Sequence, residues 1–210
     1  SERRKRSVPQ NSLRYGGVIL MTLVIGYLSA RPVLRWYYDA TEMKDNTLTQ
    51  KSIDVMKKLD GPLTITTYIN MLDEDYFRGM PRYYNEDFER FEKFVRFKPE
   101  MKLKYVYYYD KVQNSSLDRR YPGLSDEERL AKICEVEEWD VKDILTPEEI
   151  HKIEDLSGEY NKFARVIERG NGQKSILRIY DDNMRHPSET EITAAFKRLT
   201  MKLPKVAFIN

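Results

Sequence analysis

The sequence predicts a mixed α/β domain, of the α+β kind, preceded by one membrane-spanning helix. Three observations lead to this prediction. Residues 15–30 are uncharged, in a chain of 210 residues of which 33% are charged. Two runs rich in β-branched and aromatic residues, 63–69 and 103–109, enclose a segment with helical spacing. Capping boxes and a tight glycine turn then predict further helices and a hairpin.

The uncharged segment predicts a membrane anchor over residues 15–34. Basic residues are concentrated in the first fourteen positions, and the aromatic run 36–38 follows the segment. This is the pattern of a helix whose N-terminal flank, 1–14, is cytoplasmic. The 16 uncharged residues cover about 24 Å of a bilayer core about 30 Å thick, so the flanking arginines would extend outward. A cleaved signal peptide and a buried core helix remain alternatives.

The body of the chain begins with a predicted strand, helix and strand. A juxtamembrane linker and first helix, 35–62, lead to the first strand at 63–69. After a loop, 70–84, a helix is expected over 85–98, because its phenylalanines recur on one face and a proline follows. The second strand is 103–109. A helix between two strands favours parallel pairing through a right-handed crossover.

The second half of the body is predicted to be mainly helical, with one hairpin. A polar loop, 110–124, comes first, and a Gly-Asn-Gly turn joins the hairpin arms 163–169 and 173–180. Pro204 ends the last helix, and the strand-like run 205–209 follows. Three helices are each opened by a capping box: Ser125 with Glu128, Thr146 with Glu149, and Ser188 with Glu191.

This order of elements is that of a thioredoxin-like fold, a mixed sheet flanked by helices. We therefore expect a thioredoxin-like extracytoplasmic domain over residues 63–203, with 204–210 as the first strand of a following domain. The loop after the first strand contains no cysteine, and Cys134 is the only cysteine in the chain. Thiol–disulfide exchange is therefore excluded by residue type.

No group of residues predicts a catalytic, cofactor-binding or metal site. His151 and His186 are the only histidines and lie far apart, and the acidic run 73–75 lacks the spacing of a calcium loop. The sequence also lacks a phosphate-binding glycine loop and a nucleophile elbow. Most of the positive charge behind the net +2 lies in the first fourteen residues, so we expect no nucleic-acid partner.

Two groups of tyrosines could contact a ligand or a partner. Tyr105, Tyr107 and Tyr109 share one face of the second predicted strand, which favours core packing over a platform for a sugar. The pair Tyr83-Tyr84 lies in the predicted loop before the helix. That pair is the better candidate for contact with a partner.

Three segments together resemble one known family. Residues 39–49 contain Asp-Ala-Thr-Glu and Thr-Leu-Thr, residues 59–65 read LDGPLTI, and residues 193–208 contain TAAFKRLT followed by PKVAF. Over roughly 39–210 the chain resembles the GldG-like auxiliary component of bacterial ABC-type transport systems, which is associated with gliding motility. In such proteins a Gly-His-Gly-Glu turn usually follows the last strand, and here it would lie beyond Asn210.

The resemblance implies a non-catalytic accessory subunit, without a cofactor, in the cytoplasmic membrane of a bacterium. Its partners would be the ABC permease and ATPase subunits, and it would contact the bilayer through residues 15–34. That segment would be a single span or the last span of a larger permease, with the C-terminal part in the periplasm. A second hypothesis is an anchored or secreted extracytoplasmic enzyme whose active site lies in a domain after residue 210.

Overall fold

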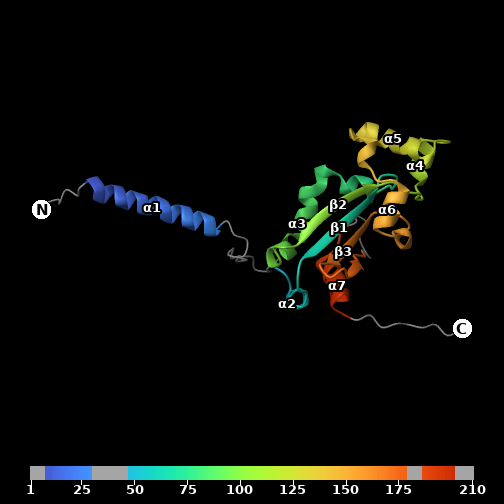
Figure 1. The fold of residues 1–210 in the computed structure, drawn as a ribbon. Coiled ribbons are helices and arrows are strands. Elements are labelled where there is room, and N and C mark those ends of the chain that lie inside the picture. Colours follow the sequence, from blue (N-terminus) through green and yellow to red (C-terminus); the bar gives the residue numbers. More distant parts are fainter. Residues whose placement is uncertain (1–7, 30–46, 179–185, 202–210) are drawn as a thin grey trace. The chain divides into compact units, whose positions relative to one another are not determined.

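The computed structural model describes residues 8–29, 47–178 and 186–201, and it divides the chain into two units at Asn46. The described part of the first unit is the helix α1, which spans Val8–Ser29 (Figure 1). The helix therefore begins before the predicted anchor and takes in part of the predicted flank.

Helix α1 has the length and composition of a membrane span. Its segment Ser12–Ser29 is apolar enough to cross a bilayer, and none of that segment is buried in the structure. Large apolar side chains such as Leu20 and Ile25 are exposed along it. The predicted end of the anchor, 30–34, and the aromatic run 36–38 lie outside the described residues.

The second unit, from Thr47, is built on a four-stranded mixed sheet in the order β2-β1-β3-β4. The strand β1 (Leu63–Asn70) pairs in parallel with β2 (Lys102–Tyr108) and antiparallel with β3 (Ala164–Arg169). The short strand β4 (Lys174–Ile176) pairs antiparallel with β3. Because β1 and β2 are parallel, both end at one edge of the sheet, here called the carboxyl edge, and both begin at the amino edge.

Three helices pack on one face of the sheet: α2 (Gln50–Met56), α3 (Tyr84–Phe97) and α7 (Glu189–Thr200). Their apolar side chains meet Leu63, Ile65 and Ile167 of the sheet, with the rings of Phe94 and Phe196 5.5 Å apart. These phenylalanines belong to the helical faces that the sequence pattern indicates.

One ion pair is buried in this layer. Arg165 of β3 donates to both carboxylate oxygens of Asp87 on α3, at 2.8 and 2.7 Å, and Tyr105 of β2 donates to the same carboxylate. The side chains of Arg165 and Asp87 are 3% and 4% exposed. Hydrogen bonds from Arg165 and Tyr105 hold the pKa of Asp87 below its usual range, although burial alone would raise it.

Three short helices lie near the carboxyl edge (Figure 1). They are α4 (Ser115–Arg120), α5 (Asp126–Glu137) and α6 (Pro147–Ile153). Ile150 of α6 packs on the second face of the sheet against Tyr68 and Tyr108. Apolar side chains of α4 and α5 form a further cluster with residues that follow β1.

The structure confirms a mixed α/β fold with a four-stranded mixed sheet and flanking helices. All three capping boxes are formed, and Thr49 caps α2. The prediction of an uninterrupted loop over 110–124 is wrong: Asn114 caps α4 by accepting a hydrogen bond from the Leu117 amide. The predicted loop 70–84 likewise contains two short 3₁₀ turns, Tyr76–Gly79 and Pro81–Tyr83.

The second arm of the predicted hairpin is shorter than expected. The structure limits β4 to Lys174–Ile176, whereas the sequence pattern indicates a strand over 173–180. Residues 179 and 180 of that arm, and the predicted strand 205–209, lie outside the described residues.

Candidate functional site

A buried asparagine organises the carboxyl edge of the sheet. Asn70 ends β1 and is 0% exposed. Its amide nitrogen donates to the carbonyls of Asp110 (2.9 Å) and Asn161 (2.8 Å), and its side-chain oxygen accepts from the Leu72 amide (3.0 Å). The Asp110 amide is a fourth, longer partner at 3.4 Å. One side chain therefore joins three segments that are far apart in the sequence.

The carboxylate of Asp110 extends this network to the surface. Asp110 follows the end of β2, and its Oδ2 lies 2.7 Å from Nε2 of His151 on α6 and 3.0 Å from the amide nitrogen of Asn161. The other oxygen accepts from the Lys111 amide at 2.7 Å. Every hydrogen bond of this carboxylate thus fixes the backbone or a side chain beside the sheet edge.

The turn before β3 has an unusual backbone. Tyr160 and Asn161 both have positive φ angles, 58° and 53°, in the left-handed region that asparagine adopts more readily than tyrosine. The Asn161 carbonyl accepts from Asn70 and from the Tyr108 hydroxyl (3.0 Å), so the turn is held from inside the domain. As a result, the side chain of Tyr160 is directed outward and is 81% exposed.

A second carboxylate, Asp73, is buried next to this turn. It is 1% exposed, and its Oδ2 accepts from the Phe163 amide at 2.8 Å. Its other oxygen has no hydrogen-bond partner among the described residues. Burial raises the pKa of Asp73 above the usual carboxyl value, with the Phe163 amide acting against the shift.

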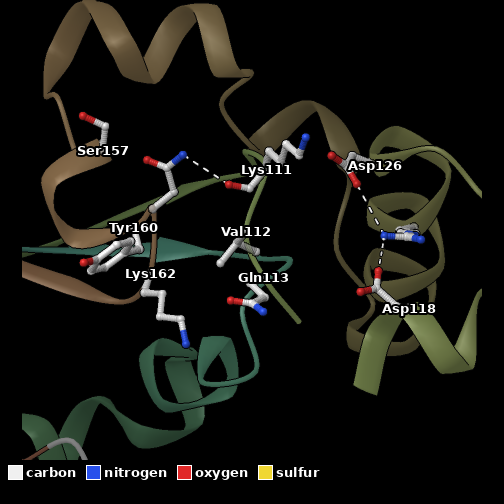
Figure 2. Close-up of a pocket in the computed structure, with 10 residues that line it drawn as sticks. Lys111, Val112, Gln113, Asp118, Asp126, Ser157, Tyr160 and Lys162 are labelled. Carbon is white, nitrogen blue, oxygen red and sulfur yellow. Dashed lines mark hydrogen bonds and ion pairs between the residues drawn. The ribbon is translucent and has the colours of Figure 1, made fainter. Parts of the chain in front are cut away.

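A cleft of about 750 Å³ opens beside Asn161 of this network. Figure 2 shows the side chains that line it. Residues 111–113, which follow β2, form one wall, and the turn that ends at Lys162 forms another. The N-terminal half of α5 and the adjoining α4 complete it. The lining is polar apart from Val112 and the ring of Tyr160; its members are Lys111, Val112, Gln113, Asp118, Asp126, Arg129, Ser157, Tyr160, Asn161 and Lys162.

The charges around the cleft are only partly paired. Arg129 lies between two carboxylates, at 2.8 Å from Asp118 and 3.7 Å from Asp126. Lys162 is 3.7 Å from Glu74, and Lys111 forms no ion pair with a described residue. The hydroxyl of Ser157 donates to Asp155 at 2.6 Å, and the described residues bring no imidazole to it. The cleft therefore offers hydrogen-bond donors, amino groups and an aromatic face, which are the means of binding a polar ligand or a polypeptide.

The structure places the sequence candidates as follows. His151 pairs with Asp110, and His186 lies near Arg90 of α3, so the two histidines are in different parts of the domain. Among the described residues, no three His, Cys, Asp or Glu side chains are arranged to hold a metal ion. Cys134 is buried in α5, and burial raises the pKa of its thiol.

The tyrosines have structural contacts. Tyr105 and Tyr107 are half-buried, Tyr109 is buried, and all three pack in the cluster near the carboxyl edge. In the pair Tyr83-Tyr84, the ring of Tyr84 stacks on Tyr105 with centroids 3.9 Å apart, and its hydroxyl lies 2.5 Å from that of Tyr107. Tyr83 is also partly buried in this cluster. The pair is therefore engaged within the domain.

Sequence reasoning missed the residues that build the site. Asn70 and Asp110 each lie at or just after the end of a predicted strand, and Asn161 lies just before the hairpin. Polar residues at the ends of parallel strands are a usable signal, because ligands of open α/β sheets bind there. The convergence of Asn161 with the other two depends on antiparallel pairing of β3 with β1, which the sequence pattern does not specify.

Comparisons of the chain with models of known protein families, with curated proteins and with solved structures find no match.

Proposed function

We propose that this chain is a non-catalytic, membrane-anchored accessory subunit of a bacterial ABC-type transport system of the GldG-like, gliding-motility kind. Its domain would bind a partner subunit or an exported substrate outside the cytoplasm. The cleft at the carboxyl edge carries the proposal, because its walls stand on a hydrogen-bond network centred on the fully buried Asn70. A rigid polar surface of this kind favours recognition, since little ordering is required on binding.

The anchoring part of the proposal is supported by α1. Its exposed apolar side chains need a non-aqueous environment, and the stretch Ser12–Ser29 is long enough to supply a span. The basic residues that precede it in the sequence favour a cytoplasmic N-terminus in the cytoplasmic membrane. The domain from Thr47 would then lie in the periplasm, beside the permease, and the ATPase would act from the other side.

We also propose that the domain is thioredoxin-like. The order β2-β1-β3-β4, with β3 antiparallel to its neighbours, supports this assignment. So does the position of α3 between the parallel strands β1 and β2. In this chain the loop after β1 contributes Met71 and Leu72 to the core, at 0% and 2% exposure, and carries no thiol. The fold would therefore serve as a scaffold for binding.

Affinity purification of the full chain from detergent-solubilised membranes tests the proposal. The tagged wild type should recover an ABC permease and an ATPase, identified by mass spectrometry. Lys111→Glu and Tyr160→Asn should reduce that recovery at least about fivefold. Asparagine is chosen at 160 because it tolerates the left-handed backbone of the turn. Lys142→Glu is the matched control, because Lys142 is also an exposed lysine but does not line the cleft.

Three results would contradict the proposal. The chain could purify alone or from the soluble fraction, both cleft variants could retain their partners at wild-type levels, or the purified chain could turn over a substrate by itself. The last result would favour the alternative of an extracytoplasmic enzyme.

A further inference from the structure

The charges of the domain are separated along the direction of β1 and β2. Between Asp110 and Glu159, the segment that contains α4, α5 and α6 at the carboxyl edge, the chain has fifteen acidic side chains and seven lysines and arginines. This gives a net charge of −8 with histidine neutral. A region with so large an excess of one sign creates a field that extends beyond single ion pairs.

The amino edge is basic. Four exposed lysines lie there: Lys57 and Lys58 follow α2, Lys102 begins β2, and Lys197 is in the last turn of α7. None of the four forms an ion pair with a described residue. The nearby Lys98, by contrast, is neutralised by Glu100 at 2.9 Å.

Hydrogen bonds show that these segments meet at one end of the domain. Lys98, just after α3, donates to the Leu59 carbonyl at 2.7 Å. Arg169, at the end of β3, donates to the carbonyls of Asp60 and Leu199, both at 3.3 Å. The C-terminal ends of α2, α3 and α7 therefore surround the start of β1, as Figure 1 also shows.

Two large apolar side chains are exposed at the same end. Phe97, the last residue of α3, is 40% exposed, and Met201, just after α7, is 51% exposed. A lysine in the last turn of a helix complements the helix dipole, which accounts for the sign of Lys197. That effect does not account for the exposed Phe97 and Met201. Basic side chains around apolar ones are the composition of a surface that lies on a lipid bilayer.

We propose that the amino edge of the domain is a docking surface for an anionic lipid bilayer. It consists of Lys57, Lys58, Phe97, Lys102, Lys197 and Met201. The inference goes beyond the proposed accessory function and rests only on its membrane anchoring. Each lysine near an anionic surface should contribute roughly a fivefold gain in membrane association at low salt. The acidic carboxyl edge is repelled by the same surface, so docking would turn the cleft away from the lipid.

Lysine acylation of the full chain in vesicles tests the inference. The chain is reconstituted in phosphatidylcholine alone or with about one third phosphatidylglycerol, and acylation rates are read by mass spectrometry. Lys142 and Lys152 are internal references, because both are exposed at the acidic end. The acylation rate of each of the four amino-edge lysines is divided by that of the reference lysines. This ratio should be at least about threefold lower on the anionic vesicles than on the phosphatidylcholine vesicles. The difference should disappear at high salt, which screens surface charges.

A pair of variants tests the apolar part of the surface. Phe97→Ser should weaken the protection of the lysines on anionic vesicles. Ile153→Ser is the matched control, because Ile153 is an apolar residue of α6 at the other end and is 50% exposed, against 40% for Phe97. It should leave the protection unchanged.

Equal relative rates on both kinds of vesicle would overturn the inference. So would the same protection by inorganic phosphate with neutral vesicles, since that would indicate a site for small anions. Flotation with neutral vesicles reports anchoring separately. If the chain does not float, the anchoring proposal fails. The docking surface is then tested on its own: anionic vesicles are added to the unanchored chain, and the acylation of the lysines is measured again. Absence of protection in that experiment would also overturn the docking surface. Recovery of transporter subunits plays no part in either readout.

Discussion

Replacement of Asn70 should show how far the site depends on one side chain. In Asn70→Ala, the Leu72 amide and the Asp110 carbonyl lose the hydrogen bonds that Asn70 provides, while the Asn161 carbonyl keeps the Tyr108 hydroxyl. Each buried polar group left without a partner costs about 1–3 kcal/mol. We therefore expect the free energy of unfolding to fall by about 3–5 kcal/mol, a large part of the 5–15 kcal/mol typical of a domain.

The nearly isosteric Asn70→Asp is the sharper test. It places a carboxylate oxygen where the amide nitrogen now lies 2.9 and 2.8 Å from two carbonyl oxygens. A buried charge that faces acceptors should cost at least about 1 kcal/mol more than alanine at pH 7. Protonation restores one donor, so the deficit relative to the wild type should shrink as the pH falls toward about 4.

Urea unfolding of the full chain in detergent, followed by near-UV circular dichroism, measures both effects. Asn171→Ala is the control, because Asn171 is an exposed turn residue whose side chain, among the described residues, is hydrogen-bonded to Gln173 alone. Its replacement should change stability by under about 1 kcal/mol. If Asn70→Asp unfolds at the urea concentration of the wild type, the buried network does not hold the carboxyl edge together. A larger loss for alanine than for aspartate at pH 7 would refute the donor geometry.

Three further predictions concern other buried groups. Asp87→Ala should cost about 3–5 kcal/mol, because it leaves Arg165 buried without its carboxylate partner. Addition of Arg165→Met should recover most of that loss in the same urea assay. A double variant no more stable than Asp87→Ala would contradict this. Asp73→Asn keeps an acceptor for the Phe163 amide and should stabilise the domain at neutral pH. Because the pKa of Asp73 is raised in the folded state, ionisation of Asp73 destabilises that state. The gain in stability of Asp73→Asn should therefore vanish below the ordinary carboxyl pKa of about 3.9. A gain that persists at lower pH would point to another cause. Gly79→Ala should cost about 1–3 kcal/mol, since the added methyl carbon would overlap Cγ1 and Cδ1 of Ile69, well inside van der Waals distance. An unchanged melting temperature would show that Ile69 can move aside.

Local sequence signals predict most of the elements. Period-two and helical spacing locate β1, β2 and α3, and the capping boxes locate the starts of α5, α6 and α7, because each signal is complete within a few residues. The short helix α4 was missed because its six residues, SSLDRR, have no apolar stripe and depend on the Asn114 cap.

The site needs information that local signals do not carry. Asn70, Asp110 and Asn161 are separated by 40 and 51 residues and meet only when β3 pairs beside β1. The sequence pattern predicts a hairpin but does not specify its neighbour in the sheet. The stacking of Tyr84 on Tyr105 was not predicted for a similar reason, because Tyr105 lies on a strand and becomes adjacent only when α3 packs on the sheet.

The interior position of β1 also determines when the domain can fold during synthesis. The strand leaves the ribosome early, but its antiparallel neighbour β3 follows about one hundred residues later, as the pairing of Thr64 with Glu168 shows. Until then one edge of β1 has no partner, and an unpaired apolar strand is open to association with other chains. The segment made in the meantime, from Asp110 to Glu159, carries the net charge of −8, which keeps the nascent chain solvated and repels other copies of it. Completion of the sheet is therefore a late, non-local step, and slow folding limited by β3 docking is the expected kinetic behaviour.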